Sequence, residues 1–172
     1  MSRYEFVPAS SWLSIHARSP THPIDVEAAG ITGAVEAEPG ETGALLADSG
    51  ELTVDVSQLR SGSALVDRET QRRLDLRRHP HITARLTRAT PTASGDVFAC
   101  EGVITLLGVE RPAHGELTVS VTDDGSLHLD GEQQFDVREW GIEPPRLLLL
   151  RVHPRVRVRL RALARPVERA DG

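Results

Sequence analysis

Cysteine is almost absent from this 172-residue sequence, because Cys100 is the only one. A single cysteine excludes an internal disulfide framework and a cysteine-rich zinc site. Lysine and asparagine are absent altogether, so all 20 basic residues are arginines. Both missing residues use A-rich codons, which points to a GC-rich genome and lowers the weight given to any arginine cluster.

Long apolar runs are also missing. The longest, at residues 147–150, holds four leucines and is far too short to span a bilayer. The first residues, Met1 to Phe6, carry no apolar signal-peptide core. We therefore expect a cytoplasmic protein without stable membrane insertion.

The charge and the motifs exclude several functions. The net charge of −5 argues against a nucleic-acid-binding protein. Neither G-x-S-x-G nor H-E-x-x-H occurs, so we expect no enzyme, no catalytic residues and no cofactor. His79 and His81 have a spacing that could suit a metal, but no third ligand is evident nearby, and no metal site is predicted. Cys100 is interpreted as a small buried hydrophobic residue.

The length suits a single domain over residues 1–172, with a core at about 4–164 and a disordered tail at 165–172. Apolar and polar residues alternate over short segments separated by turn signals, which predicts about eight antiparallel strands. The last strand is the clearest, because four apolar residues alternate with four arginines: Val156, Val158, Leu160 and Ala162 against Arg155, Arg157, Arg159 and Arg161.

The strands are expected to close on themselves. Several predicted strands exceed about 30 Å at the usual rise per residue. Glycines at 30, 33, 102 and 131 suit sharp bends or bulges within such strands. Closure into a barrel removes the exposed edges of an open sheet. An eight-stranded interior is either just filled by side chains or holds one small ligand, and the sequence leaves both open.

One segment breaks the strand pattern. Residues 67–75 predict a short helix with Asp67 as its N-cap and with Val66, Thr70 and Leu74 on one face. This helix lies between two predicted strands, so we expect it to flank or cap the barrel. A second helical turn is predicted at residues 138–142.

Three stretches, in this order, resemble the YceI-like family of lipocalin-like barrel proteins. Residues 67–82 resemble its R-D…L-D…Y/H-P-x-I-x-F segment, with the R-D order reversed. Residues 102–112, GVITLLGVERP, resemble its G-x-L-T-x-x-G-V-T-R-P signature, with Glu110 in place of the threonine. Residues 135–142 resemble F-x-x-x-R-x-x-F-G-I, with Arg138 and Trp140 placed slightly differently.

The resemblance extends over roughly Tyr4 to Ala164. It implies an all-β, eight-stranded antiparallel lipocalin-like barrel crossed by a helix, with an apolar bore that binds a polyisoprenoid or a similar amphiphilic chain. The sequence departs from the family at Ala84, where relatives carry an aromatic residue. The bore is therefore either wider here or refilled by aliphatic side chains.

These patterns predict a ligand site inside the barrel. Arg88 continues the face of Ile82, Ala84 and Leu86 at the end of the same predicted strand. Arg88 and Arg138 are candidates for contact with an anionic head group at a barrel mouth. Trp12 and Trp140 are interpreted as core fillers or barrel plugs, and Trp140 is also included in the site. The predicted apolar lining consists of Ile15, Ile82, Ala84, Leu86, Ile104, Leu106, Phe135 and Val158.

The outer arginine row has two interpretations. It could bind phosphates or an anionic membrane surface. It could instead form cross-strand pairs with Asp130, Glu132 and Asp136 of the preceding strand, and this second interpretation is favoured.

Two functions follow for the whole chain. The first is a non-enzymatic carrier of an isoprenoid or a similar amphiphilic lipid. The alternative is a solid barrel that acts as a protein-interaction or stress-related structural module without a lipid ligand. A homodimer stays open, because no pattern in the sequence argues for or against one.

Overall fold

The structure, a computed structural model, describes residues 1–41, 43–143, 146–147 and 150–168. Residues 148–149 of the leucine run and 169–172 of the predicted tail lie outside the described residues. The strands that form one connected sheet are β1 (Ser2–Phe6), β2 (Trp12–Ala17), β3 (Ile24–Ala29), β4 (Thr32–Gly40), β5 (Gly43–Asp55), β6 (Leu59–Arg60), β7 (His81–Pro91), β8 (Val97–Leu106), β9 (Val109–Val121), β10 (Leu127–Asp136) and β13 (Arg155–Pro166). The remaining elements are β11 (Arg146–Leu147), β12 (Leu150–Arg151), the helix α1 (Ala64–Arg73) and the 3-10 turns η1 (Pro8–Ser10), η2 (Val56–Gln58) and η3 (Val137–Trp140).

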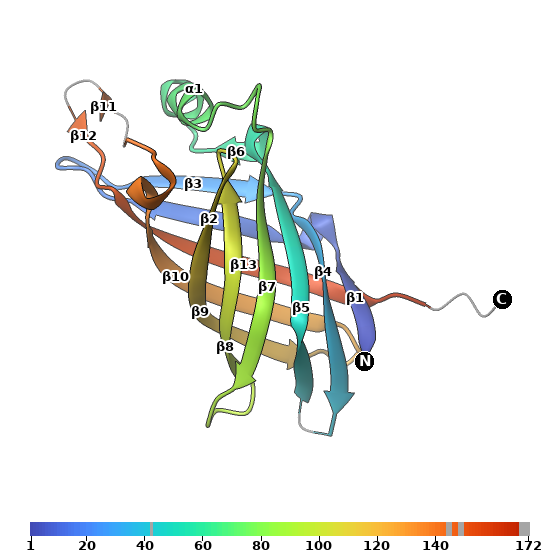
Figure 1. Cartoon of the computed structure of the whole chain (residues 1–172). Coiled ribbons are helices and arrows are strands. Elements are labelled where there is room, and N and C mark those ends of the chain that lie inside the picture. Colours follow the sequence, from blue (N-terminus) through green and yellow to red (C-terminus); the bar gives the residue numbers. More distant parts are fainter. Residues whose placement is uncertain (42, 144–145, 148–149, 169–172) are drawn as a thin grey trace.

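Eight strands close into a ring, as the alternation predicts. The order is β1-β4-β5-β7-β8-β9-β10-β13, and β13 pairs back onto β1. All of these pairings are antiparallel. Figure 1 shows β5, β7 and β8 on one wall of this ring, with β2, β3 and β13 crossing them on the other wall. The predicted fold class, an all-β eight-stranded antiparallel lipocalin-like fold with one short helix, is confirmed.

The extra strands are continuations of ring strands beyond a bend. β1 continues through η1 into β2, β4 is preceded by β3, and β5 continues through η2 into β6. The continuations pair in the same neighbour order as the ring, because β13 pairs with β2, β2 with β3 and β3 with β6. At one such bend, Gly30 has a φ of +73°, a left-handed conformation that favours glycine.

The helix begins earlier than the sequence pattern indicates. We expected residues 67–75 with Asp67 as N-cap, but α1 runs from Ala64 to Arg73 and its N-cap is Ser63, whose hydroxyl accepts a hydrogen bond from the Val66 amide. Asp67 lies in the first turn and instead accepts from the amide and hydroxyl of Ser61. Its carboxylate therefore fixes the loop before the helix. Among the described residues, no helix has both the length and the apolar composition that a bilayer-spanning helix needs.

The last ring strand extends past the predicted core. We expected disorder from residue 165 onward, but Arg165 and Pro166 belong to β13 and pair with Glu5 and Tyr4 of β1. This pairing closes the ring.

The two ends of the ring differ in structure. The hairpin end carries the β4–β5, β7–β8 and β9–β10 connections, and the helix end carries α1 (Figure 1). The inner side chains of the hairpin end are almost completely buried and fill it, among them Leu46, Phe98, Val119, Leu127, Leu129, Ala162 and Ala164. Of the two alternatives that the sequence leaves open for the interior, the hairpin end is the one filled by side chains.

Candidate functional site

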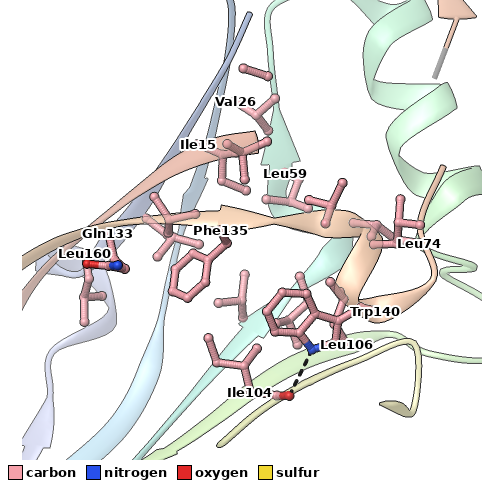
Figure 2. Close-up of a pocket in the computed structure, with 18 of the residues that line it drawn as sticks. Ile15, Val26, Leu59, Leu74, Ile104, Leu106, Gln133, Phe135, Trp140 and Leu160 are labelled. Carbon is pink, nitrogen blue, oxygen red and sulfur yellow. Dashed lines mark hydrogen bonds between the residues drawn. The ribbon is translucent and has the colours of Figure 1, made fainter. Parts of the chain in front are cut away.

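A cavity of about 370 Å³ occupies the helix end of the ring. Its volume lies within the range of small-molecule sites in proteins. Strands from all sides of the ring contribute inward-pointing aliphatic side chains to its wall (Figure 2). The residues that form this wall include Leu13, Ile15, Val26, Leu52, Leu59, Ile82, Ile104, Leu106, Val156, Val158 and Leu160.

A second compartment of about 200 Å³ continues toward the hairpin end. Small residues make this space, because Gly50, Ala84, Cys100, Gly102 and Gly115 all line it. The two compartments share wall residues, which places them end to end along the ring. The shared residues are Leu52, Ala84, Ile104, Glu116, Leu117, Gln133, Phe135 and Leu160. The interior is therefore elongated, and it ends where the filled hairpin end begins.

The helix α1 forms part of the cavity wall. Val66, Thr70 and Leu74, which the sequence places on one helix face, all line the cavity. Arg73 lies on the same face, one turn from Thr70, and lines it too. In a barrel filled by side chains, this face of α1 would pack against other residues. Here it borders the cavity instead.

Trp140 closes one side of the cavity at the helix end. Its ring is buried, with 4% of its surface exposed, and its indole Nε1 donates a hydrogen bond to the Ile104 carbonyl oxygen at 3.1 Å (Figure 2). Phe135 meets it edge to face, with ring centroids 6.1 Å apart. A buried indole N–H needs such a partner, so the bond fixes the orientation of the ring.

The structure brings most of the predicted lining together. Leu86 lies on the wall of the second compartment and not of the larger one. Ala84 lies at the junction, so the absence of a ring at this position leaves the passage between the compartments open. The predicted residues that line the larger cavity are Ile15, Ile82, Ala84, Ile104, Leu106, Phe135, Trp140 and Val158.

The prediction for Arg88 is wrong. Leu86 pairs with Gly102 and Arg88 with Glu101, so Thr87 is an extra residue that makes a bulge in β7. A bulge of one residue reverses which side chains point inward. Beyond it Ala89 is buried and Arg88 is exposed on the outer surface, away from both compartments.

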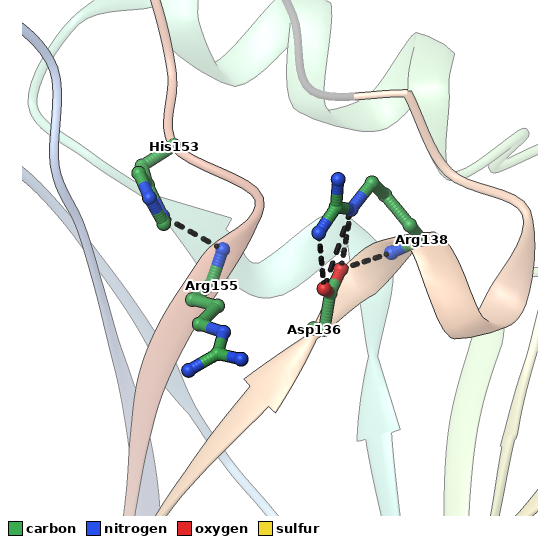
Figure 3. A network of polar contacts seen from close by, with 4 residues as sticks. All are labelled: Asp136, Arg138, His153 and Arg155. Carbon is green, nitrogen blue, oxygen red and sulfur yellow. Dashed lines mark hydrogen bonds and ion pairs between the residues drawn. The ribbon is translucent and has the colours of Figure 1, made fainter.

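Arg138 is not among the residues that line the cavity. Its guanidinium is exposed and lies against the Asp136 carboxylate, with Nη2 and Oδ2 2.7 Å apart (Figure 3). Asp136 also caps η3 by accepting a hydrogen bond from the Arg138 amide at 3.0 Å. These hydrogen bonds lower the pKa of Asp136 to about 2. The arginine therefore fixes the rim of the helix end and does not enter the cavity.

Three of the four outer arginines form the cross-strand pairs that the sequence favours, whereas Asp136, the third expected partner, pairs with Arg138 instead. Arg159 lies 3.0 Å from the Asp130 carboxylate and Arg161 lies 3.3 Å from it, while Arg157 lies 3.4 Å from Glu132. The interpretation of Trp12 as a core filler is wrong, because its ring lies on the outer surface under the Arg161 guanidinium. The alternation of the sequence already predicts this outward position, because Trp12 lies on the same strand face as Ser14 and His16.

Several polar residues on the cavity wall escaped the sequence reasoning, among them Glu116 and Glu132, which both line the larger cavity. Gln133 lies at the junction of the two compartments (Figure 2). Arg73 and His153 line the larger cavity at the helix end. The spacing of Arg73 from Val66 and Thr70 is a helical-face spacing, so Arg73 could have been found.

Cys100 and the histidines show no reactive arrangement. The Cys100 side chain lines the second compartment, and burial raises the pKa of its thiol to about 11, so the thiol stays protonated near neutral pH. In the part of the chain that the structure describes, no three His, Cys, Asp or Glu side chains converge on a metal-sized site.

These features define a class of protein: a closed antiparallel ring, filled at one end, with an elongated apolar cavity and a helix at the other. The chain belongs to the YceI-like domain family, whose model matches residues 4–164. No curated protein sequence matches it.

Solved structures share the fold at low sequence identity. BcnA from Burkholderia cenocepacia has a TM-score of 0.75 at 15% identity, over 89% of this chain and 95% of that one. A polyisoprenoid-binding domain from Saccharophagus degradans, implicated in plant cell wall breakdown, has a TM-score of 0.78 at 12% identity, over 97% and 100%. The Campylobacter jejuni YceI protein has a TM-score of 0.62 at 10% identity, over 80% and 82%.

Proposed function

We propose that the protein binds an amphiphilic lipid, with an isoprenoid as the first candidate, and holds its apolar chain in the cavity without catalysing a reaction. The observation that carries this proposal is the elongated cavity of about 370 Å³ with its continuation of about 200 Å³. An elongated apolar space is complementary to a linear chain. Each methylene that leaves water for such a wall contributes about 0.8 kcal/mol to binding.

Two further observations support an isoprenoid. The chain belongs to the YceI-like family, and its fold resembles that of a polyisoprenoid-binding domain. Aliphatic residues such as Ile82 and Ile104 dominate the wall, which suits an apolar hydrocarbon chain. The outer arginines pair with Asp130 and Glu132, so they supply little free charge for an alternative binding surface.

The first experiment is organic extraction of the purified protein, followed by mass spectrometry of the extract. We expect about one isoprenoid or lipid per chain. An empty extract would be followed by direct titration, because a ligand can be lost during purification.

The titration uses tryptophan fluorescence. The sequence has two tryptophans, so Trp12→Phe leaves Trp140 on the cavity wall as the single reporter. Farnesol should change the Trp140 emission and saturate at one equivalent. An empty extract together with no response to farnesol, to longer isoprenoids or to fatty alcohols would contradict the proposal. The protein-interaction or structural module would then be the better account.

A further inference from the structure

The polar groups at the helix end of the cavity supply mainly hydrogen-bond donors. Arg73, which is half-buried, and His153, which is exposed, both line the cavity. The Thr70 hydroxyl, on the same wall, already donates to the Val66 carbonyl oxygen at 2.8 Å. The free donors are therefore those of Arg73 and His153.

Arg73 lacks a hydrogen-bond acceptor for part of its guanidinium within the part of the chain that the structure describes. Its Nε is buried and makes no hydrogen bond among the described residues. Leaving a buried charged donor without an acceptor is costly, and a guanidinium has five N–H groups to satisfy. An acceptor supplied from within the cavity would remove this cost.

Glu69 is the carboxylate that lies near Arg73, and it does not satisfy it. Its Oε2 is 3.8 Å from the Arg73 Nε, beyond hydrogen-bond distance. Its other oxygen, Oε1, accepts from Arg72 at 3.4 Å. Glu69 therefore balances part of the Arg73 charge but leaves its N–H groups available.

His153 adds a second donor to the lining of the same cavity. Its Nδ1 accepts the Arg155 backbone N–H at 3.1 Å (Figure 3). In the neutral imidazole the proton then resides on Nε2, which becomes a donor.

We propose that Arg73, together with His153 of the same cavity lining, binds the anionic head group of the ligand at the helix end of the cavity. This inference rests on the proposed function, because it places the head group of the lipid whose chain lies in the cavity. The chemistry is that of a carboxylate or a phosphate ester, both of which accept several charge-assisted hydrogen bonds from a guanidinium. The chain then points toward the second compartment and the filled hairpin end.

The test compares two probes that differ only in the head group. Farnesyl phosphate and farnesol share one chain, so their affinity ratio reports the head-group contact alone. The same ratio for dodecanoate and dodecanol asks whether a carboxylate serves as well as a phosphate. We expect the wild-type protein to prefer the anionic member of at least one pair by 10-fold or more, since hydrogen bonds to charged groups have this strength.

Variants then assign the preference to a residue. Arg73→Met keeps the aliphatic stem and should abolish the preference, while affinity for farnesol changes by less than about 3-fold. Glu69→Gln removes the neighbouring carboxylate and should tighten farnesyl phosphate by about 2- to 5-fold. Arg68→Met is the control, because Arg68 is exposed on the same helix and does not line the cavity. A thermal melt checks that each variant is folded.

The outcomes separate the two proposals. If the wild type binds farnesol but shows no preference for either anion, or if Arg73→Met retains the preference, the head-group assignment is overturned and the proposed function stands. If no probe binds the wild-type protein at all, the proposed function fails and the head-group assignment fails with it. The wild-type preference needs no variant, so the assignment can be overturned even if Arg73→Met does not fold.

Discussion

The hairpin end and the helix end are built from the same strands, yet one is solid and the other is hollow. At the hairpin end Phe98, Val119 and Leu127 are each at most 1% exposed. At the helix end the same strand β8 contributes Ile104 and Leu106, and its neighbour β7 contributes Ala84, which all border the cavity. The closed ring alone therefore does not make a binding site. Even small side chains such as Ala162 and Ala164 are buried at the filled end, while large ones border the cavity, so the separation of the facing walls decides which part of the ring stays open.

The largest test of this comparison is to truncate one phenylalanine at each end. Phe98→Ala should lower the free energy of unfolding by about 3–5 kcal/mol, because it leaves a void in a packed region. Phe135→Ala should lower it by about 2 kcal/mol or less, because its ring already borders open space. Urea unfolding followed by circular dichroism measures both. Equal losses would mean that the helix end is packed in solution.

The second test adds the same bulk at each end. Ala162 is 2% exposed at the hairpin end, so Ala162→Phe should lower the free energy of unfolding by about 1–3 kcal/mol or more through overpacking. Ala84→Phe should leave stability nearly unchanged, because its ring can enter the junction of the compartments. The same variant should reduce the ligand recovered by extraction. Wild-type ligand recovery from Ala84→Phe would remove Ala84 from the site.

The third test compares the two tryptophans, one inside and one outside. Trp140→Phe loses the hydrogen bond to the Ile104 carbonyl and should lower the free energy of unfolding by about 1 kcal/mol. Trp12→Phe loses part of the stacking with Arg161 on the outer surface, where the arginine lies 5.3 Å from the ring centroid, and should cost about 0.5 kcal/mol. Denaturation midpoints distinguish them. A costlier Trp12 variant would contradict the assignment of Trp140 as the wall residue fixed by its hydrogen bond.

The smallest expected effect concerns the rim of the helix end. Arg138 lowers the pKa of Asp136 to about 2, below the ordinary value of about 4 for an unfolded aspartate. The charged carboxylate therefore contributes stability above about pH 4, and this contribution is lost as the pH falls toward 2. Asp136→Asn should remove this part of the acid sensitivity in urea midpoints measured at pH 7, 4 and 2. Asp123→Asn, in an exposed turn, is the matched control and should follow the wild type.

Much of the fold could be predicted because strand alternation survives intact in most strands. The pattern of β13 predicts both its inner face and its outer ion pairs with β10. The resemblance of residues 102–112 to the family signature falls on the β8–β9 hairpin, where Leu107 and Gly108 both have positive φ. The inner face of α1 was also predictable, since Val66, Thr70 and Leu74 recur at a helical spacing.

The rest depended on features that alternation does not encode. An extra residue such as Thr87 leaves no mark on composition, yet it turned Arg88 outward. Arg138 was assigned to the ligand site on position alone, whereas its guanidinium is held by Asp136 and does not line the cavity. Whether inner side chains meet across the ring depends on the radius and bends of the ring. The alternation of residues does not encode these, so it does not predict that the helix end is hollow.

The pairing of β13 also bears on how the protein is made. β13 is the last ring strand to leave the ribosome, yet it must pair with β10 on one side and with both β2 and β1 on the other. Until then the β1–β2 edge and the β10 edge stay unpaired, and such edges are templates for aggregation. Contacts this distant along the chain also close slowly. We therefore expect folding to finish only after synthesis, with the nascent chain dependent on chaperones during that interval.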